Sequence, residues 1–356
     1  MKRLFALWLT AGLIVSGCGL LGGSGGPCGS GSAPASPSGA ASTLKVGIVT
    51  DIGQLEDKSF NEYSCRGVLD GTRAIGAPDP KVIVTKDIAD YKQNIQSFVD
   101  QKYDIIVTVG FLIGTDTLAA AKANPSIQFF GIDQFICVAK DASDKECKGD
   151  VPANYQGLIF NEAQAGYLAG IVAGTITKSN KIGAVGGRSD VPPVVSYIKG
   201  YENAAKTVKP GVQVLINYVE DFNAPDKGEA SAKTMIGQGA DVIFQVAGLT
   251  GAGALRAACN AKIWGIGVDV DQYLSLPDSK ACIVTSAEKH LQNAARDAIK
   301  RFKDKGKQTG NYVNDATNGG VGASPIRNLN PVPAGLEDKL KQATADMASG
   351  KLKPVT

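Results

Sequence analysis

Three aspartates follow short apolar runs at widely separated points of the chain, and each run is typical of a buried strand. Asp51 follows KVGIVT, Asp133 follows QFFGI and Asp269 follows IWGIGV. A single aspartate in such a place commonly caps the next helix or forms a turn with its own backbone, and that interpretation stays open for each of the three. Together they indicate a shared function, because a carboxylate accepts paired hydrogen bonds from vicinal hydroxyls, each contributing about 1.5–3 kcal/mol.

Two aromatic residues also stand in polar loops. Phe60 and Phe222 are each followed by an asparagine, the first of these being Asn61. Either ring could belong to the core, but in a site it would stack on a flat ligand ring, an interaction of about 1–3 kcal/mol per base. Gly248 and Lys289 follow two further apolar runs, although a lysine in such a place is by default a solvated surface group. Diol acceptors, an aromatic clamp and an amide describe a nucleoside site.

Composition excludes several other classes of site. The chain carries a formal net charge of +3 and a single histidine, His290. A near-neutral balance gives no reason to expect nucleic acid, and one histidine argues against catalytic triads and histidine-based metal sites. There is no CxxC pattern, and the candidate site residues, with several acidic groups and few basic ones, make a poor phosphate cradle. We therefore expect no metal, no cofactor and no catalysis.

The first 18 residues are typical of a secretory signal. Lys2 and Arg3 precede an apolar run over 4–15, which is too short for a typical membrane span, and VSGC follows at 15–18. The VSGC segment resembles the lipobox of bacterial lipoproteins. This predicts lipidation of Cys18 and a chain anchored on the extracytoplasmic face of the cell membrane. A signal that merely contains a cysteine remains the alternative.

Residues 19–43 consist almost wholly of Gly, Ser, Ala and Pro, which cannot bury enough apolar surface to fold. They are predicted to form a flexible tether, with Cys28 exposed in it. The remaining cysteines fit an oxidising compartment but are odd in number. Two pairings are guesses that stay open, Cys137 with Cys147 and Cys259 with Cys282.

From residue 44 onward, apolar runs alternate with helix-like segments. The runs are nearly continuous rather than alternating, which is typical of parallel strands covered on both faces. A doubly wound α/β fold follows, and a chain of 356 residues with ten strands favours two lobes of about five strands each. Ligands bind such sheets outside the carboxyl ends of the strands. The candidate strands are 45–50, 81–85, 104–110, 128–133, 157–160, 181–187, 212–219, 241–247, 263–270 and 282–288.

Several motifs, in order along the chain, resemble those of the basic membrane protein family of PnrA-like lipoproteins. These are substrate-binding components of bacterial nucleoside ABC importers. The similarity begins with VTDIGQLEDKSFNEYSCRGVLDG at 49–71 and covers essentially everything after the tether. The other matching segments are 161–174, 181–187, 198–206, 221–230, 265–272 and 347–355.

The resemblance implies a two-lobed type I periplasmic-binding-protein fold, each lobe a parallel sheet flanked by helices. It implies a monomer that binds a nucleoside, often a purine one, between its lobes and delivers it to an ABC permease. The chain is expected to cross between the lobes near 160–163, 284–288 and 319–328. The expected division is a signal at 1–18, a tether at 19–43, an N-terminal lobe at 44–160 plus about 286–320, a C-terminal lobe at 161–285, and a returning segment at 321–356.

The resemblance also implies roles for individual residues. Phe60 and Phe222 would clamp the base, while Asn61 and Asp133 would face its edge. Asp116, in GFLIGTDTL, competes with Asp133 for this role. The loop DIGQLEDKSFN lacks the glycine pair usual in the family, which leaves the base preference open. The ribose hydroxyls would be held by Asp51, Gly248, Asp269 and Lys289.

Two rival functions were weighed. A nicotinamide-dependent enzyme should carry GxGxxG after its first strand, but DIGQLEDKSFN has one glycine there, and GLTGAGA at 248–254 has the wrong spacing. A receptor of the same fold could instead bind a sugar, or act as a surface sensor or adhesin. Sugar binders also combine carboxylates with stacking rings, so these residues alone separate the two poorly.

Overall fold

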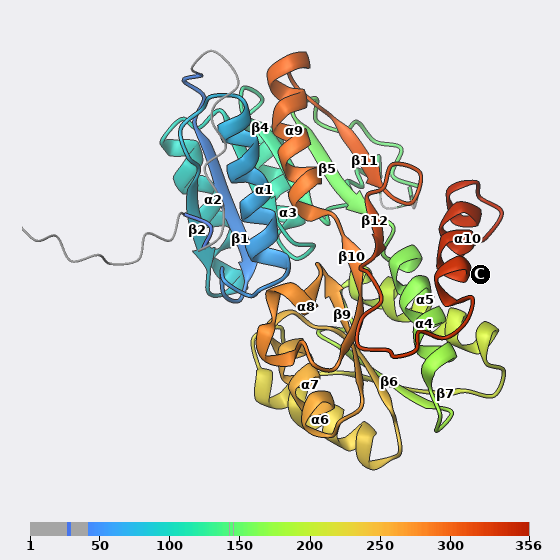
Figure 1. Cartoon of the computed structure of the whole chain (residues 1–356). Coiled ribbons are helices and arrows are strands. Elements are labelled where there is room, and N and C mark those ends of the chain that lie inside the picture. The colour runs from blue at the N-terminus through green and yellow to red at the C-terminus, as the bar shows by residue number, and fades with distance from the viewer. Residues whose placement is uncertain (1–26, 30–41, 142, 145, 356) are drawn as a thin grey trace, which may run out of the picture.

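The computed structural model describes residues 27–29, 42–141, 143–144 and 146–355. Within them the chain forms two six-stranded sheets, each flanked by helices on both faces (Figure 1). All pairings in the first sheet are parallel. In spatial order its strands are β11 (Gly310–Asn314), β5 (Tyr155–Phe160), β4 (Gln128–Ile132), β3 (Ile105–Val109), β1 (Val46–Ile52) and β2 (Lys81–Thr85).

The second sheet has the same plan, except that its edge strand β12 pairs antiparallel with β10. The parallel ladders need crossover connections, and helices supply them. In spatial order the strands are β12 (Val321–Ala323), β10 (Ile283–Lys289), β9 (Trp264–Asp269), β8 (Val242–Val246), β6 (Lys181–Gly186) and β7 (Gln213–Tyr218).

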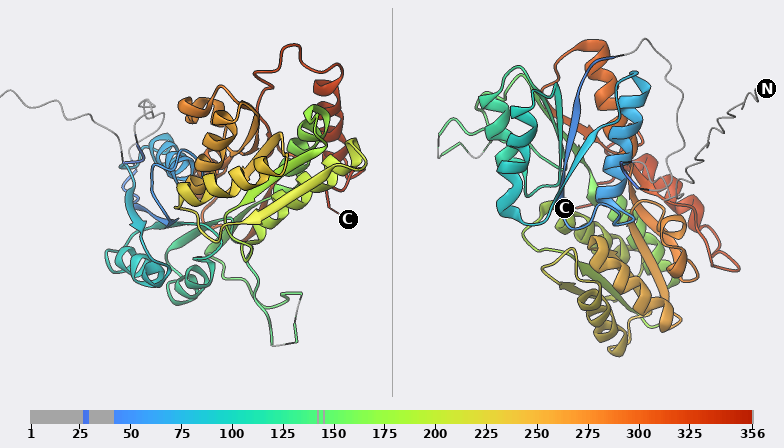
Figure 2. Two further views of the ribbon diagram at one scale, coloured as in Figure 1. Left: turned by 90° about the horizontal axis from the view of Figure 1, so that it is seen from below. Right: turned by 90° about the vertical axis from the view of Figure 1, so that its left-hand side faces the viewer.

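Helices cover both faces of the first sheet because its strands carry apolar side chains on both. In β1, Ile48 packs into one core and its neighbour Val49 into the core on the opposite face. Helices α1 (Phe60–Ala74) and α9 (Leu291–Lys305) pack together over the first face. Helices α2 (Tyr91–Asp100) and α3 (Gly114–Ala123) cover the second (Figure 2).

The second sheet is covered in the same way. Helices α4 (Glu162–Ile176) and α5 (Pro192–Val208) pack on one face, and α6 (Pro225–Gly237) and α7 (Gly248–Asn260) on the other. A Cβ on Gly166 of α4 would stand 2.0 Å from the backbone oxygen of Tyr197. Glycine therefore permits the close approach of α4 and α5. The shorter elements are η1 (Ile88–Asp90), α8 (Gln272–Ser275) and η2 (Pro277–Ser279).

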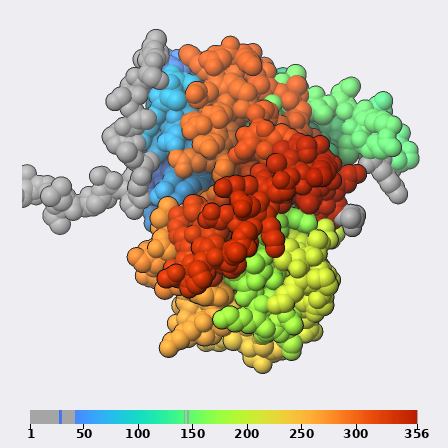
Figure 3. All heavy atoms as spheres, turned by 45° about the vertical axis from the view of Figure 1, so that its right-hand side comes forward, coloured from blue at the N-terminus to red at the C-terminus, as the bar shows by residue number. Residues whose placement is uncertain are grey.

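The chain passes between the sheets three times, after β5, after β10 and after β11. The carboxyl ends of the parallel strands in both sheets face the junction. Beyond β12 the chain passes the start of β10, where Asn328 donates to the backbone oxygen of Ile283, and reaches helix α10 (Leu336–Ala348), which packs on α4. Figure 3 shows this C-terminal segment on the surface of the molecule. Strand ends that lie far apart in sequence are thus brought to one gap.

The expected fold class is confirmed, with two strands more than expected. The sequence predicted ten strands, and the described residues form twelve, six in each sheet. The two that were missed are β11, with the polar sequence GNYVN, and β12, with three residues. Both lie at sheet edges, where little apolar sequence is needed because one side of the strand is open.

Three disulfides join the described cysteines. Those between Cys137 and Cys147 and between Cys259 and Cys282 agree with the two guessed pairings. The expectation that Cys28 is exposed was wrong: it is fully buried and bonded to Cys65 on α1. Composition predicts that a Gly- and Ser-rich segment forms no core of its own, but it does not show that a disulfide holds part of it against a helix.

The predicted signal and Cys18, the predicted lipidation site, lie outside the described residues, as do residues 19–26 and 30–41 of the tether. Across the described part of the chain, none of the helices combines the length and apolar character that a membrane crossing requires.

Candidate functional site

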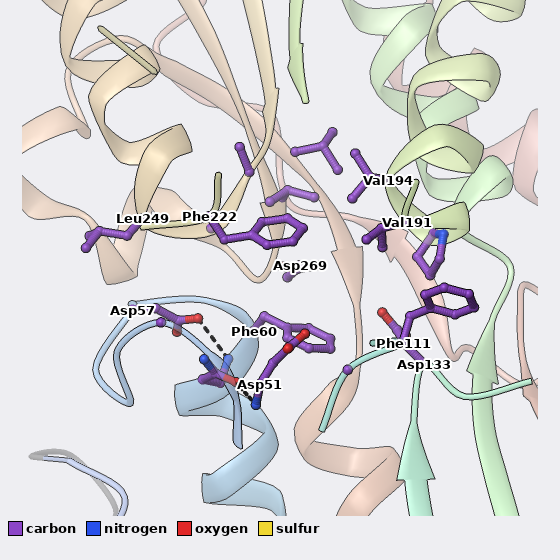
Figure 4. Close-up of a pocket in the computed structure, with 18 of the residues that line it drawn as sticks. Asp51, Asp57, Phe60, Phe111, Asp133, Val191, Val194, Phe222, Leu249 and Asp269 are labelled. Atoms are coloured by element: carbon purple, nitrogen blue, oxygen red, sulfur yellow. Dashed lines mark hydrogen bonds between the residues drawn. The ribbon is translucent and has the colours of Figure 1, made fainter. Parts of the chain in front are cut away.

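A cavity of about 670 Å³, part of it open to solvent, lies between the carboxyl ends of the two sheets (Figure 4). Asp116, the competitor considered for the base edge, is not among the residues lining it. All eight predicted ligand-binding residues line it, namely Asp51, Phe60, Asn61, Asp133, Phe222, Gly248, Asp269 and Lys289.

The turn between β1 and α1 is held together by its own polar side chains. The side-chain oxygen of Asn61 accepts a hydrogen bond from the backbone N–H of Asp51 at 3.1 Å, and its amide nitrogen donates to the backbone oxygen of Gln54 at 3.2 Å. The amide predicted to read a ligand edge therefore also fixes the position of Asp51. It leaves one amide hydrogen for a ligand.

The start of α1 is capped by Asp57, a cavity residue that the sequence analysis missed. Its carboxylate accepts backbone hydrogen bonds from Ser59 at 2.9 Å, Asn61 at 2.9 Å and Glu62 at 3.2 Å. These satisfy the free N–H groups of the first helical turn. Burial raises the pKa of Asp57 to about 7, and the three backbone donors act against that rise.

Asp51 is buried on the floor of the cavity. One carboxylate oxygen accepts hydrogen bonds from the Tyr91 hydroxyl and from the backbone N–H of Ile52. Burial raises the pKa of Asp51 to about 6, against the lowering effect of Tyr91. Gly110, with φ +99°, makes room for it, since a Cβ there would stand 2.0 Å from the second carboxylate oxygen. The hydrogen bonds from Tyr91 and Ile52 both go to the first oxygen, so the second oxygen takes part in neither.

Lys289 joins the two sheets at the centre of the site. Its ammonium donates a hydrogen bond of 2.5 Å to Asp133, which follows β4 in the first sheet. It also lies 3.7 Å from Asp269, at the end of β9 in the second sheet, and 3.8 Å from Glu162, the first residue of α4. The side chain of Lys289 is 3% exposed, so this is a buried group of charges rather than a surface ion pair.

The charges in this group shift each other's ionisation. Burial lowers the pKa of Lys289, but the carboxylates of Asp133, Asp269 and Glu162 raise it by more than burial lowers it. The pKa of Lys289 therefore lies well above its usual value. Burial raises the pKa of Asp133, with Lys289 acting against the rise. Lys289 is therefore a permanent positive charge in this site.

Asp133 retains an unused acceptor. Its Oδ1 atom is buried and has no hydrogen-bond partner among the described residues, while Oδ2 is held by Lys289. Asp133 and Asp269 both adopt positive φ values, +60° and +64°. Non-glycine residues in this conformation are uncommon and cluster at binding sites. A buried acceptor without a partner costs about 1–3 kcal/mol, which a ligand hydroxyl or amine would offset.

Two phenyl rings approach the cavity from opposite sides. Phe60 begins α1 and lies beneath the ammonium of Lys289, whose nitrogen is 4.9 Å from the ring centroid. Phe222 comes from the loop after β7 and lies over the backbone of Gly187, where a Cβ would stand 2.2 Å from the ring. Figure 4 shows Phe222 and Phe60 across the cavity from each other. Both rings are partly buried and pack against the core.

An apolar wall at one end of the cavity was also missed. Phe111, from the loop after β3, faces Val191 and Val194 at the start of α5 (Figure 4). The sequence offered one signal here, the run VPPVV, because proline is favoured at the first position of a helix. Tyr197, one turn further along α5, lies within 3.5 Å of Asp269 through its hydroxyl. No pattern in the sequence indicates that contact.

Two mostly parallel sheets whose strand ends enclose one cavity are the architecture of a type I periplasmic binding protein. The profile described as "ABC transporter substrate-binding protein PnrA-like", named Bmp, matches residues 44–349. The chain belongs to this family, and it is the substrate-binding protein of an ABC transporter.

Individual relatives support the assignment. The ABC transporter nucleoside-binding protein BmpA of Lactococcus lactis subsp. cremoris is 32% identical over 329 residues, which is 87% of this chain and 88% of that protein. A CD4+ T-cell-stimulating antigen of Listeria monocytogenes is 32% identical over 321 residues, or 85% of this chain and 84% of that protein. Both matches extend over most of the relative's length.

Solved structures show the same fold. A solute-binding protein of an ABC transporter system from Aeropyrum pernix K1 superposes with a TM-score of 0.73 at 23% identity, covering 87% of this chain and 92% of that one. A periplasmic solute-binding protein of an ABC transporter from Actinobacillus succinogenes, solved with bound D-allose, superposes with a TM-score of 0.61 at 15% identity. The match covers 80% of this chain and 98% of that one. At these identities the likeness concerns the fold alone.

Proposed function

We propose that this protein binds nucleosides, purine nucleosides foremost, and delivers them to an ABC permease. The observation that carries the proposal is the pairing of two phenyl faces, Phe60 and Phe222, with buried carboxylates in the same cavity. The rings suit a flat base, and the carboxylates suit the vicinal hydroxyls of a ribose. The name of the Lactococcus relative, a nucleoside-binding protein, points the same way.

In this proposal the ligand spans both sheets. The base stacks between Phe60 and Phe222, with Asn61 and Asp133 at its edge. The free Oδ1 atom of Asp133 is the acceptor best placed to receive a ligand hydrogen bond. The ribose hydroxyls are bound by Asp51, Gly248, Asp269 and Lys289.

The acidity of the cavity defines what it rejects. Asp51, Asp57, Asp133 and Asp269 line it together with a single cation, Lys289, and that cation already contacts carboxylates. Phosphate groups require helix N-termini or arginine and lysine clamps that are free to bind them. A nucleoside 5′-phosphate would therefore bind far more weakly than the nucleoside.

We further propose that each sheet with its helices moves as a lobe, the N-terminal lobe comprising 44–160 plus about 286–320 and the C-terminal lobe 161–285, with 321–356 returning across the hinge. A ligand that contacts both lobes favours the closed arrangement. The closed, loaded monomer would be recognised by the permease while a lipid on Cys18 holds it at the outer face of the membrane. No bond is made or broken in this cycle.

A thermal-shift screen of the full-length chain tests the proposal. Purine and pyrimidine nucleosides, free bases, nucleoside 5′-phosphates and monosaccharides are compared at equal concentration. A ligand that binds only the native state stabilises it by RT ln(1 + [L]/Kd), so at equal concentration the tighter ligand raises the melting temperature more. Nucleosides should give the largest shifts, and stabilisation by a monosaccharide but by no nucleoside would refute the proposal in favour of a sugar receptor.

A further inference from the structure

Glu162 contacts Lys289 but does not line the cavity. It is the first residue of α4, directly after the chain leaves β5 for the second sheet. Its side chain is 9% exposed, and its Oε1 atom is 3.8 Å from the Lys289 ammonium. A buried carboxyl group costs free energy unless it is paired or neutral, so its place behind the cavity requires a reason.

The reason lies in the positions of four charged groups, Glu162, Lys289, Asp133 and Asp269. Asp133 ends a strand of the first sheet and Asp269 ends a strand of the second. Glu162 and Lys289 instead stand where the chain passes between the sheets, next to α4 and α9 respectively. If the sheets move apart, Asp133 and Asp269 separate, whereas the two residues at the crossings stay close together.

We propose that Glu162 is a positioning residue that holds the Lys289 ammonium at the hinge and takes up a proton when the cavity closes on its ligand. This inference rests on the proposed nucleoside function, and it assigns to a residue outside the cavity a role in ligand affinity. In the open arrangement Glu162 is a charged partner for Lys289. In the closed one Asp133 takes over the ammonium, and Glu162 becomes a neutral acid.

The direction of the effect follows from the groups around Glu162. Burial raises the pKa of Glu162 to about 8 in this structure, where Lys289 and Ser59 connect the two sheets. Lys289 of β10 acts against the rise, and Asp133 and Asp269 add to it. Tyr197 of α5 also faces the group. Opening admits water and returns the carboxyl toward its ordinary pKa, so closure binds a proton. Because the ligand favours closure, the affinity for the ligand must fall as the pH rises through the pKa that Glu162 has in the closed arrangement.

Adenosine titrations of the full-length chain at pH 7 and pH 9 test this, because the adenine ring does not ionise between these values. One proton taken up on binding predicts an affinity loss of about tenfold across this window in the wild type. Glu162→Gln, which has the shape of the neutral acid and needs no proton to close, should bind more tightly than the wild type at pH 7 and lose no more than about twofold by pH 9. Glu162→Ala, which removes the side chain that positions Lys289 at the crossing, should bind about tenfold more weakly at pH 7.

Glu202→Gln is the matched control, because Glu202 pairs with Lys206 on the surface of α5. It should retain the wild-type pH dependence. The same pH dependence in the wild type and in Glu162→Gln, or a loss of affinity in Glu162→Gln at pH 7 equal to that in Glu162→Ala, would overturn the inference.

The same titrations with the most stabilising ligand of the thermal-shift screen, whatever its class, separate this inference from the proposed function. An equal loss of affinity between pH 7 and pH 9 in the wild type and in Glu162→Gln would refute the inference even if that ligand is a nucleoside. A loss confined to the wild type would support it even if the ligand is a monosaccharide, in which case the nucleoside function alone fails.

Discussion

The hydroxyl of Ser59, at the start of α1, donates a hydrogen bond of 2.9 Å to Asp269, at the end of β9. A serine in this place would ordinarily cap its own helix, but the side chain of Ser59 makes no capping bond. Asp57 performs the capping instead, which frees the hydroxyl to reach from the first sheet's side to the second. One turn thus positions cavity residues and connects the two halves of the molecule.

Ser59→Ala should weaken nucleoside binding by about 1 kcal/mol, close to fivefold, because the bond it removes exists only while the halves are together. Isothermal titration measures the change. The control is Ser97→Ala, which removes a hydroxyl bonded within α2, at the backbone oxygen of Gln93. Equal affinities for the two variants would show that the Ser59 bond does not contribute to closure.

Phe222→Ala should weaken nucleoside binding by at least about 1 kcal/mol, because it removes one of the two stacking faces. Phe135→Ala provides the comparison: that ring is 60% exposed and lies outside the cavity. Titration of both variants with the same nucleoside gives the difference. Unchanged affinity in Phe222→Ala would remove this ring from the site.

The disulfide between Cys28 and Cys65 should contribute more to stability than that between Cys137 and Cys147. Their sequence separations are 37 and 10 residues, and closing the longer loop removes more entropy from the unfolded chain. Replacing both cysteines of a pair by serine should lower the free energy of unfolding by about 1 kcal/mol more for the first pair than for the second. Chemical denaturation under oxidising conditions compares the two, and an equal or reversed order would contradict the prediction.

The free energy of unfolding should fall as pH rises from about 4 to about 7, in part because of Asp57. Its native pKa of about 7 lies above the ordinary value of 3.8, so the folded state holds a proton that the unfolded state releases. Asp57→Asn cannot release that proton. The variant should be less stable throughout, since its amide cannot accept all three backbone hydrogen bonds.

The difference in stability between the wild type and Asp57→Asn should be largest near pH 4 and narrow toward pH 7. Denaturation curves at several pH values measure it. A difference that stays constant, or widens with rising pH, would show that Asp57 is ionised in the folded state across this range.

Much of the candidate site could be read from strand ends. Asp51, Asp133 and Asp269 lie far apart in sequence, yet the carboxyl ends of parallel strands gather at one edge of a sheet. Apolar runs locate those ends without knowledge of side-chain contacts. Both phenylalanines could be singled out because they stand in polar loops, where the core does not require them.

Other features depend on three-dimensional packing that no local pattern records. Asp57 caps α1 in place of Ser59, whose hydroxyl bonds to Asp269 instead. Glu162 acquires its charged neighbours only because β4, β9 and β10 end at one point. Cys28 was predicted to be exposed because its neighbours are Gly, Ser, Ala and Pro, but its partner lies 37 residues away on a helix. Such pairings follow from tertiary structure, so sequence alone could not fix them.

The most direct test of the nucleoside proposal is a crystal structure of the chain grown with a purine nucleoside. We predict the base between Phe60 and Phe222, with the sugar hydroxyls within hydrogen-bond distance of Asp51 and Asp269. Density for the nucleoside outside this cavity, or inside it with the sugar rather than the base between the two rings, would contradict it.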